Sequence, residues 1–264
     1  MNNQTPGYNA TQENSSIGMT IPNSGDNQLI QMNQSYFNEL ADLSSVDIFQ
    51  DTGCIDCLFP LCTTNRYRCH ASGGNQKLYE FQEESDCCER CCLYPCRSFT
   101  MNINNIVSPK NNVSVLMEGK KPCSLICYCG CGWGKPSLSV SLKSPQGMML
   151  GKAKLNFDSC FCAIFNNRIE IIDKAGQLKY YIKPNCFCIG CACGCWAKCC
   201  EILYHIYQND VEVGKVTKLT CDGIRLCCTK ADNFTINFPS QASPEEKMLI
   251  IIGVILLDYF SFFI

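Results

Sequence analysis

The sequence predicts a mainly β fold: one closed antiparallel β-barrel between about residues 46 and 240, followed by a hydrophobic helix at the C-terminus. Two observations lead to this prediction. Short apolar runs recur along the chain, separated by Gly, Pro, Asn and Asp, a pattern typical of serial hairpins in barrels and sandwiches. The last part of the chain is instead continuously apolar. Hydrophobic residues make up 46% of the whole, which is enough for a substantial core.

The N-terminal residues 1–45 are expected to form a disordered tail. This segment is rich in Asn, Gln and Ser. Such a composition buries too little apolar surface to offset the conformational entropy that is lost on folding. The folded domain is therefore predicted to comprise residues 46–264, including a helix over 244–264.

The strands are identified from hairpin signals. Residues 173–176 (Asp-Lys-Ala-Gly) separate two β-branched and aromatic runs, and residues 208–210 (Gln-Asn-Asp) separate another two. Asn, Asp and Gly favour the tight turns that join antiparallel neighbours. Residues 144–147 (Ser-Pro-Gln-Gly) end a segment in which polar and apolar residues alternate, as in a half-buried strand. The expected strands are 137–142, 168–172, 178–182, 201–207, 211–216 and 235–238.

A weak internal repeat relates the two halves of the predicted barrel. Asn65-Arg66 recurs as Asn167-Arg168, and at the same offset Gly74 recurs as Gly176. Tyr79 recurs as Tyr181 at this offset too. Two related β halves that close into one barrel would explain the matches; chance identity is the alternative.

The C-terminal helix has a clear start signal. Ser243 suits the N-cap, Pro244 suits the first helical position, and Glu246 completes a capping box with Ser243. Residues 248–264 are mostly apolar and carry one charged side chain, Asp258. At ~1.5 Å per residue they cover roughly 25 Å, less than the about 30 Å of a bilayer core. A helix that is apolar on all sides lies either in lipid or inside protein, and both locations are open at this point.

Two specific motifs resemble those of the phospholipid scramblases, a family whose core is similar to the tubby C-terminal domain. The first is residues 86–92 (Asp-Cys-Cys-Glu-Arg-Cys-Cys), followed by Pro95, Arg97 and Phe99. The second is residues 232–239 (Asp-Asn-Phe-Thr-Ile-Asn-Phe-Pro). The apolar C-terminal helix with its embedded acid also fits the family. The resemblance covers about residues 46–264.

The resemblance implies a tubby-like barrel of about twelve strands, with the helix either central in the barrel or inserted in a membrane. It also implies ATP-independent, bidirectional movement of phospholipids between membrane leaflets, stimulated by calcium. Such a protein associates with membrane phospholipids, here most simply at the plasma membrane with the bulk of the chain on the cytosolic side. It needs no covalent chemistry, so an enzyme is not expected, and oligomerisation is left open.

The calcium segment departs from the family pattern. The resemblance marks Asp232 and Asn233 as candidate calcium ligands, but Lys230 and Gln241 stand where the family has acidic residues. Calcium takes six to eight oxygen ligands, many of them carboxylates. Asp232 is the only carboxylate between residues 230 and 241. Weak calcium binding is therefore expected, and restoring both acids is expected to tighten it.

The chain contains 25 cysteines, many of them in clusters. Cys123, Cys127, Cys129 and Cys131 stand where the family carries a palmitoylated cluster, which makes them lipidation candidates. Lysines beside the cluster would add attraction to anionic lipid. Inert thiols packed in a loop are the alternative.

A second cluster offers a possible zinc site. Cys188, Cys191, Cys193 and Cys195 have spacings at which thiolates bind zinc, with acylation or reduced thiols as the alternatives. A disulfide framework is not expected, because the first residues lack the features of a signal peptide and cytosolic thiols stay reduced.

Other sites are sparse. Asp258 is either a polar element on a lipid headgroup path or a buried acid bonded to the barrel backbone, and we favour the second interpretation. His70 and His205 have no evident catalytic partners. The net charge of −2 argues against a nucleic-acid partner.

Three functions are consistent with these observations. The first is a membrane-associated phospholipid scramblase. The second is a lipid-anchored, tubby-like binding or adaptor module that transports nothing. The third is a soluble, cysteine-rich zinc-binding regulator.

Overall fold

The structure is a computed structural model, and it describes residues 35–51, 64–85, 99–109, 113–120, 137–157, 167–184, 202–219 and 233–261. These residues belong to one compact unit, Ser35–Ile264. The prediction of a mainly β, antiparallel fold with one C-terminal helix is confirmed.

The described residues form twelve strands, a short 3-10 helix and one α-helix. The helices are η1 (Asn38–Leu40) and α6 (Pro244–Ser261). The strands are β1 (Ser45–Asp51), β2 (Arg66–Ala71), β3 (Lys77–Glu84), β4 (Phe99–Asn105), β5 (Val113–Lys120), β6 (Ser137–Lys143), β7 (Met149–Phe157), β8 (Asn167–Asp173), β9 (Leu178–Pro184), β10 (Ile202–Gln208), β11 (Val211–Leu219) and β12 (Asn233–Asn237).

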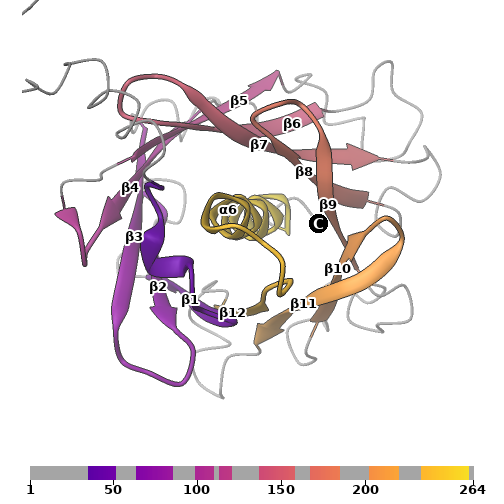
Figure 1. The fold of residues 1–264 in the computed structure, drawn as a ribbon. Helices are drawn as coiled ribbons and strands as arrows, with labels where there is room; N and C mark the ends of the chain where they lie inside the picture. Colours follow the sequence, from indigo (N-terminus) through magenta and orange to yellow (C-terminus); the bar gives the residue numbers. More distant parts are fainter. Residues whose placement is uncertain are drawn as a thin grey trace, which may run out of the picture. The chain divides into compact units, whose positions relative to one another are not determined.

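Each strand pairs with its neighbours in sequence, and the order closes on itself. β1 pairs with β2 on one side and with β12 on the other, so that Ile48 lies opposite both Cys69 and Phe234. The strands form a ring around α6 (Figure 1). Apolar residues on alternate positions face inward, as the period of a strand requires.

The hairpins lie where the sequence predicts them. β8 and β9 flank the turn at residues 174–177, and β10 and β11 flank Asn209 and Asp210. Asn209 and Asp210 have φ values of 50° and 63°, the left-handed conformation of a two-residue hairpin turn. The last strand is shifted from its expected position: β12 covers residues 233–237 rather than 235–238.

The internal repeat matches strands of the two halves correctly, but its constant offset pairs Tyr79 with Tyr181, which is not the structural counterpart of Tyr79. Cys69 lies opposite Tyr79 in the β2–β3 hairpin, and Ile171 lies opposite Tyr180 in the β8–β9 hairpin. Tyr79 and Tyr180 are both buried inside the barrel, whereas Tyr181 faces outward. The β2–β3 turn is one residue longer than the β8–β9 turn. After the turn, residues that are matched at a constant offset therefore lie on opposite faces of their strands.

The two ends of the barrel differ in their connections. Because neighbouring strands are antiparallel, successive connections alternate between the two ends. One end, here called the hairpin rim, carries the short connections 72–76, 106–112, 144–148, 174–177 and 209–210, together with 238–243. The other end, here called the cysteine rim, carries the connections 52–65, 85–98, 121–136, 158–166, 185–201 and 220–232.

Helix α6 runs inside the barrel from the hairpin rim toward the cysteine rim. Its residues from Met248 to Leu257 are buried on all sides, so the strands provide the apolar surroundings that such a helix needs. A Cβ atom at Gly253 would lie 2.9 Å from Ile171 Cδ1, which shows how closely the helix approaches β8. Of the two predicted locations of the helix, the structure has the one inside the barrel. Within the described residues, no helix meets the length and apolarity needed to cross a membrane.

The predicted tail is too long at its C-terminal end. Residues 35–44, here called the strap, include η1 and pack on the hairpin rim next to the start of α6. Phe37 and Leu40 are fully buried in the core. The composition of residues 1–45 hides these two anchors, because polar neighbours dilute them. Disorder of residues 1–34 stays a prediction.

Candidate functional site

The cysteine-rim end of α6 carries a buried acid. Asp258 is fully buried, and Tyr67 of β2 donates a hydrogen bond from its hydroxyl to Asp258 Oδ2 at 2.5 Å. The prediction of a buried, hydrogen-bonded acid is therefore confirmed, but the partner shown is a side chain rather than the barrel backbone. Burial of a polar group without such a partner costs free energy, so this contact helps to fix the position of the helix.

A second buried carboxylate lies on the neighbouring strand β3. Glu83 is 1% exposed, and its Oε2 accepts bonds from the backbone N–H of Asn65 at 3.2 Å and from Asn65 Nδ2 at 2.9 Å. Ser85 donates to Glu83 Oε1 at 2.6 Å, and Gln50 Nε2 donates to Asn65 Oδ1 at 3.3 Å. Gln50 lies opposite Tyr67 in the sheet. The cysteine-rim ends of β1, β2 and β3 are therefore polar on their inner side.

The hairpin-rim end of α6 holds the strap through one lysine. The ammonium of Lys247 donates to the carbonyl oxygens of Leu40, Ala41 and Leu43 at 2.9, 2.7 and 3.0 Å. Lys247 also lies over the Phe238 ring at 5.8 Å. Burial lowers the pKa of this amine, and the charge of Asp42 opposes the shift. All three ammonium protons are used, so α6 and the strap are joined by a three-point contact.

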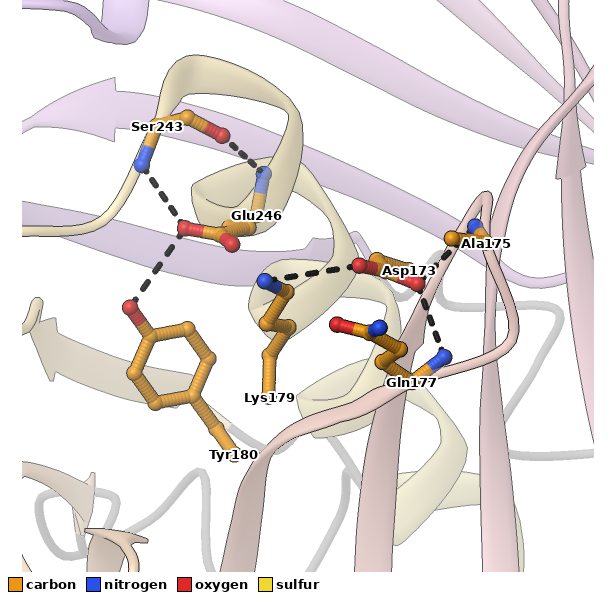
Figure 2. Close-up of polar contacts among 7 residues, drawn as sticks. All are labelled: Asp173, Ala175, Gln177, Lys179, Tyr180, Ser243 and Glu246. Atoms are coloured by element: carbon orange, nitrogen blue, oxygen red, sulfur yellow. Dashed lines mark hydrogen bonds and ion pairs between the residues drawn. The ribbon is translucent and has the colours of Figure 1, made fainter.

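Two of the buried tyrosines, Tyr180 and Tyr79, contact the helix and the strap near the hairpin rim. Tyr180 donates to Glu246 Oε2 at 3.4 Å, and Tyr79 donates to Glu39 Oε2 at 2.9 Å. Glu246 also accepts from the backbone N–H of Ser243 at 3.0 Å, and Ser243 Oγ accepts from the Glu246 N–H at 3.3 Å. Figure 2 shows this reciprocal pair beside Tyr180. The predicted capping box is confirmed.

The Tyr180 contact predicts a change of stability at alkaline pH. Burial, followed by the charge of Glu246 and the hydrogen bond to it, raises the pKa of Tyr180 from 10.0 to about 12. Because the folded-state pKa is raised, the stabilising contribution is present below about pH 10 and is lost as the pH rises through about 12. Tyr180→Phe should therefore flatten the fall in unfolding free energy over this range, measured by urea unfolding under reducing conditions.

Tyr181 provides the matched control for that experiment. Its hydrogen bond to Asp210 raises the pKa of Tyr181 to about 12 as well, but this hydroxyl lies at the exposed surface. Water screens such contacts, so Tyr181→Phe should change the slope less than Tyr180→Phe. An equal change in both variants would contradict the assignment to Tyr180.

Most of the sequence-predicted site residues lie outside the described residues. This holds for the lipidation candidates Cys123, Cys127, Cys129 and Cys131, for the zinc candidates Cys188, Cys191, Cys193 and Cys195, and for Asp232. Their segments nevertheless join described strand ends: 121–136 connects β5 to β6, 185–201 connects β9 to β10, and 220–232 connects β11 to β12. All three connections belong to the cysteine rim.

The two ends of the calcium segment lie at opposite ends of the barrel. Asn233 is the first residue of β12, at the cysteine rim, and it lies opposite Phe49 and Leu219. Gln241 is exposed in the connection between β12 and α6, at the hairpin rim. From Asn233 to Asn237 the strand rises about 13 Å, whereas ligands of one calcium ion lie within about 5 Å of each other. Residues at the two ends of this segment therefore do not share one ion.

Several buried polar contacts were missed at the level of sequence. Lys247 is the only cation within the helix. Because a buried cation needs hydrogen-bond partners, the sequence could have predicted that Lys247 donates to acceptor groups near the start of the helix. No sequence signal identifies Tyr67 or Glu83, because their roles depend on long-range pairing. Among the described residues, no group of three or more His, Cys, Asp or Glu side chains is arranged to hold a metal ion.

Comparison with known proteins assigns the chain to a family. A family model described as Scramblase matches residues 23–263. Phospholipid scramblase 1 of Homo sapiens is 26% identical over 228 residues, which cover 84% of this chain and 64% of that protein. Phospholipid scramblase 2 of Bos taurus is 25% identical over 228 residues, covering 84% and 70%.

A third relative is Phospholipid scramblase family member 5 of Homo sapiens, which is 25% identical over 225 residues, covering 84% of this chain and 75% of the relative. No solved structure matches the chain. The match to human phospholipid scramblase 1 spans less than two thirds of that protein's length. The family model, in contrast, covers nearly the whole of this chain, and on that ground the chain belongs to the scramblase family.

Proposed function

We propose that this protein moves phospholipids between the leaflets of a membrane, in both directions, without ATP and without covalent chemistry. The observation that carries the proposal is the family match over residues 23–263, together with relatives named phospholipid scramblase. The resemblance in the cysteine motif and in β12 points to the same activity. The fold proposed with it is a tubby-like barrel around a central helix.

Reconstitution of the full chain into vesicles tests this function. Fluorescent phospholipid is placed in both leaflets, and a membrane-impermeant reductant destroys the label that it reaches. Protein-free vesicles should keep the inner-leaflet share of the signal. Vesicles with the protein should lose most of it in the absence of ATP. Protein that binds the vesicles and leaves the inner-leaflet signal intact would overturn the proposal.

The second candidate function is a lipid-anchored binding or adaptor module that transports nothing. The position of α6 favours it, because the helix is buried among the strands and is therefore shielded from lipid in this arrangement. Binding without lipid movement in the vesicle assay is the result that this candidate predicts. A stoichiometric amount of zinc in protein purified without an affinity tag would instead favour the third function, a zinc-binding regulator.

We further propose that thioester-linked acyl chains on Cys123, Cys127, Cys129 and Cys131 hold the chain on the cytosolic face of the plasma membrane. One acyl chain binds a bilayer reversibly, and two bind it stably. Hydroxylamine cleaves thioesters, so treatment of membranes from cells that express the protein should release it to the soluble fraction. Retention of all the protein after treatment would contradict this mode of anchoring.

Calcium is proposed to bind this chain only weakly through the β12 segment. The full chain should show a dissociation constant of about millimolar or weaker by calorimetry, because Asp232 has no neighbouring carboxylate in its segment and Lys230 adds a like charge to that of the ion. Lys230→Asp should tighten binding. Gln241→Asp should leave it unchanged, since β12 separates the two positions, and it is the matched control. Micromolar binding by the unmodified chain would falsify the proposal.

A further inference from the structure

The charged side chains of the strands are divided unequally between two sides of the barrel. One side consists of β6–β11, a continuous arc of the ring, and the other of β12 and β1–β4 (Figure 1). The charged strand residues of the β6–β11 side that are not buried are the cations Lys143, Lys152, Lys154, Arg168, Lys179, Lys183, Lys215 and Lys218 and the acids Glu170, Asp173 and Glu212. By the same rule, the other side has Arg66, Arg68 and Lys77 against Asp47, Asp51, Glu80 and Glu84. The β6–β11 side is therefore basic, and the other side is slightly acidic.

Ion pairs within the β6–β11 side leave most of its positive charge unmatched. Glu170 pairs with Arg168 at 2.9 Å, and Asp173 pairs with Lys179 at 3.4 Å. Each of these pairs removes one charge of each sign. The lysines of this side that form no ion pair with any described residue are Lys152, Lys154, Lys183 and Lys215. Their charge is available to a partner outside the barrel.

Two of these lysines lie on either side of a histidine. His205 of β10 lies opposite Lys183 of β9 and opposite Lys215 of β11, so three basic side chains form one row across neighbouring strands, about 5 Å apart. The row faces outward, since the neighbouring residues on these strands point into the core. Like charges in register destabilise a sheet. Glu212, the only acid on the three strands, lies 2.8 Å from His205 Nδ1. An anionic surface over the row would reduce the repulsion that remains.

Exposed apolar side chains lie at the hairpin tips of the same side. The exposed large apolar residues of the described part of the chain are Ile106, Val107, Met148, Met149, Leu178 and Val211. Four of them flank the β6–β7, β8–β9 and β10–β11 turns, and the other two lie in the connection from β4 to β5, the neighbour of β6. The β2–β3 turn of the other side, residues 72–76, is Ser-Gly-Gly-Asn-Gln and adds none. Basic and apolar surface therefore coincide on one side of the barrel.

We propose that the outer face of β6–β11, together with its hairpin tips, docks on an anionic bilayer. The proposal rests on the proposed function, in that a lipid-moving protein must meet a bilayer, and it adds which surface of the barrel does so. Lysines close to an anionic bilayer strengthen binding through charge. Apolar side chains at the tips would enter the region between headgroups and acyl chains. Because lysine side chains are long and flexible, they can reach a flat surface from a curved sheet.

The combination of charge and apolar tips favours a bilayer over a nucleic acid. Phosphates of a nucleic acid would attract the lysines but would leave the apolar tips in water, whereas a bilayer accommodates both. The opposite side of the barrel offers neither feature. Its Arg68 pairs with Asp51, and its Lys77 pairs with Glu80 at 3.1 Å. That side therefore supplies matched control positions.

The first measurement compares vesicle binding by charge variants of the full, unacylated chain. Sedimentation uses vesicles of phosphatidylcholine alone and of phosphatidylcholine with phosphatidylserine. The double variant Lys183→Gln with Lys215→Gln should bind the anionic vesicles about tenfold more weakly. The control, Arg66→Gln with Lys77→Gln, removes the same charge from the other side and should bind as the unmodified chain does. Equal loss of binding in both double variants would mean that only net charge matters, and it would overturn the proposal.

The second measurement identifies the side that contacts lipid. A photo-crosslinking amino acid replaces exposed Ala175 in the β8–β9 turn or exposed Asn75 in the β2–β3 turn. Both turns belong to the hairpin rim, but they lie on opposite sides of the barrel. Cross-linking to anionic vesicles from position 175 and not from position 75 supports the proposal.

Three further results would contradict it. They are cross-linking from both positions equally or from 75 alone, absence of binding to any vesicle, and binding to duplex DNA as tight as to anionic vesicles without cross-linking to lipid. None of these readouts involves lipid movement, so failure of the transport assay would leave the docking result standing.

Discussion

Replacing Gly151 by alanine should destabilise the barrel by about 3 kcal/mol, because it combines a steric clash with backbone strain. Gly151 lies in β7 with a φ of 151°. A Cβ atom there would lie 2.8 Å from the carbonyl oxygen of Ile172 and 2.5 Å from Leu249 Cδ1 of the helix. The leucine can rotate, but the oxygen is held by the pairing of β7 with β8. Urea unfolding of the reduced protein measures the loss.

Gly74→Ala is the matched control for this prediction. Gly74 lies in the β2–β3 turn without a positive φ, and the nearest atom to its Cβ would be 3.7 Å away. Its unfolding free energy should stay within about 0.5 kcal/mol of the unmodified chain. If Gly151→Ala cost no more than Gly74→Ala, the close approach of α6 and β8 to β7 would not be a constraint on the fold.

The sequence was sufficient to predict the class of the fold and the start of the helix, for local reasons. Asn209 and Asp210 adopt the turn conformation that their side chains favour, and Ser243 and Glu246 cap the helix through bonds between near neighbours. Such contacts span few residues and depend on residue type alone. The same local logic failed at the strap, where two buried anchors lie in a polar composition.

The candidate site was less predictable, because its contacts join residues far apart in the chain. Tyr67 and Asp258 meet only once β2 and α6 are both in place. The spacing between Tyr79 and its structural counterpart Tyr180 depends on the length of one turn. A comparison at one fixed spacing cannot detect a difference in turn length. That the cysteine-containing connections all join strand ends at one rim was also hidden in the sequence, because strand alternation is defined only when all the strands are known.

Replacing Lys247 by methionine should both destabilise the fold and loosen the strap. The ammonium donates to three carbonyl oxygens of residues 40–43, and Lys247 itself is only 5% exposed. Methionine fills similar space but donates nothing, so these acceptors lose their partner in a largely buried setting. A buried acceptor left without a partner costs about 1–3 kcal/mol. A total loss of about 3 kcal/mol is expected, since water can reach some of the three oxygens.

Two measurements separate this anchoring from a general loss of stability. Urea unfolding gives the global change, and hydrogen exchange in native conditions reports on the strap, where the Ala41 N–H bonds to Asn38 and the Leu43 N–H to Leu40. These two amides should exchange faster in Lys247→Met, while amides in β7 and β8 change only as the global stability does. Lys174→Met removes the same charge from an exposed turn and should alter neither measurement. Unchanged exchange at Ala41 and Leu43 in the Lys247 variant would mean that apolar packing of Phe37 and Leu40 alone holds the strap. The hydrogen bonds of the lysine would then only offset the free-energy cost of burying its own charge.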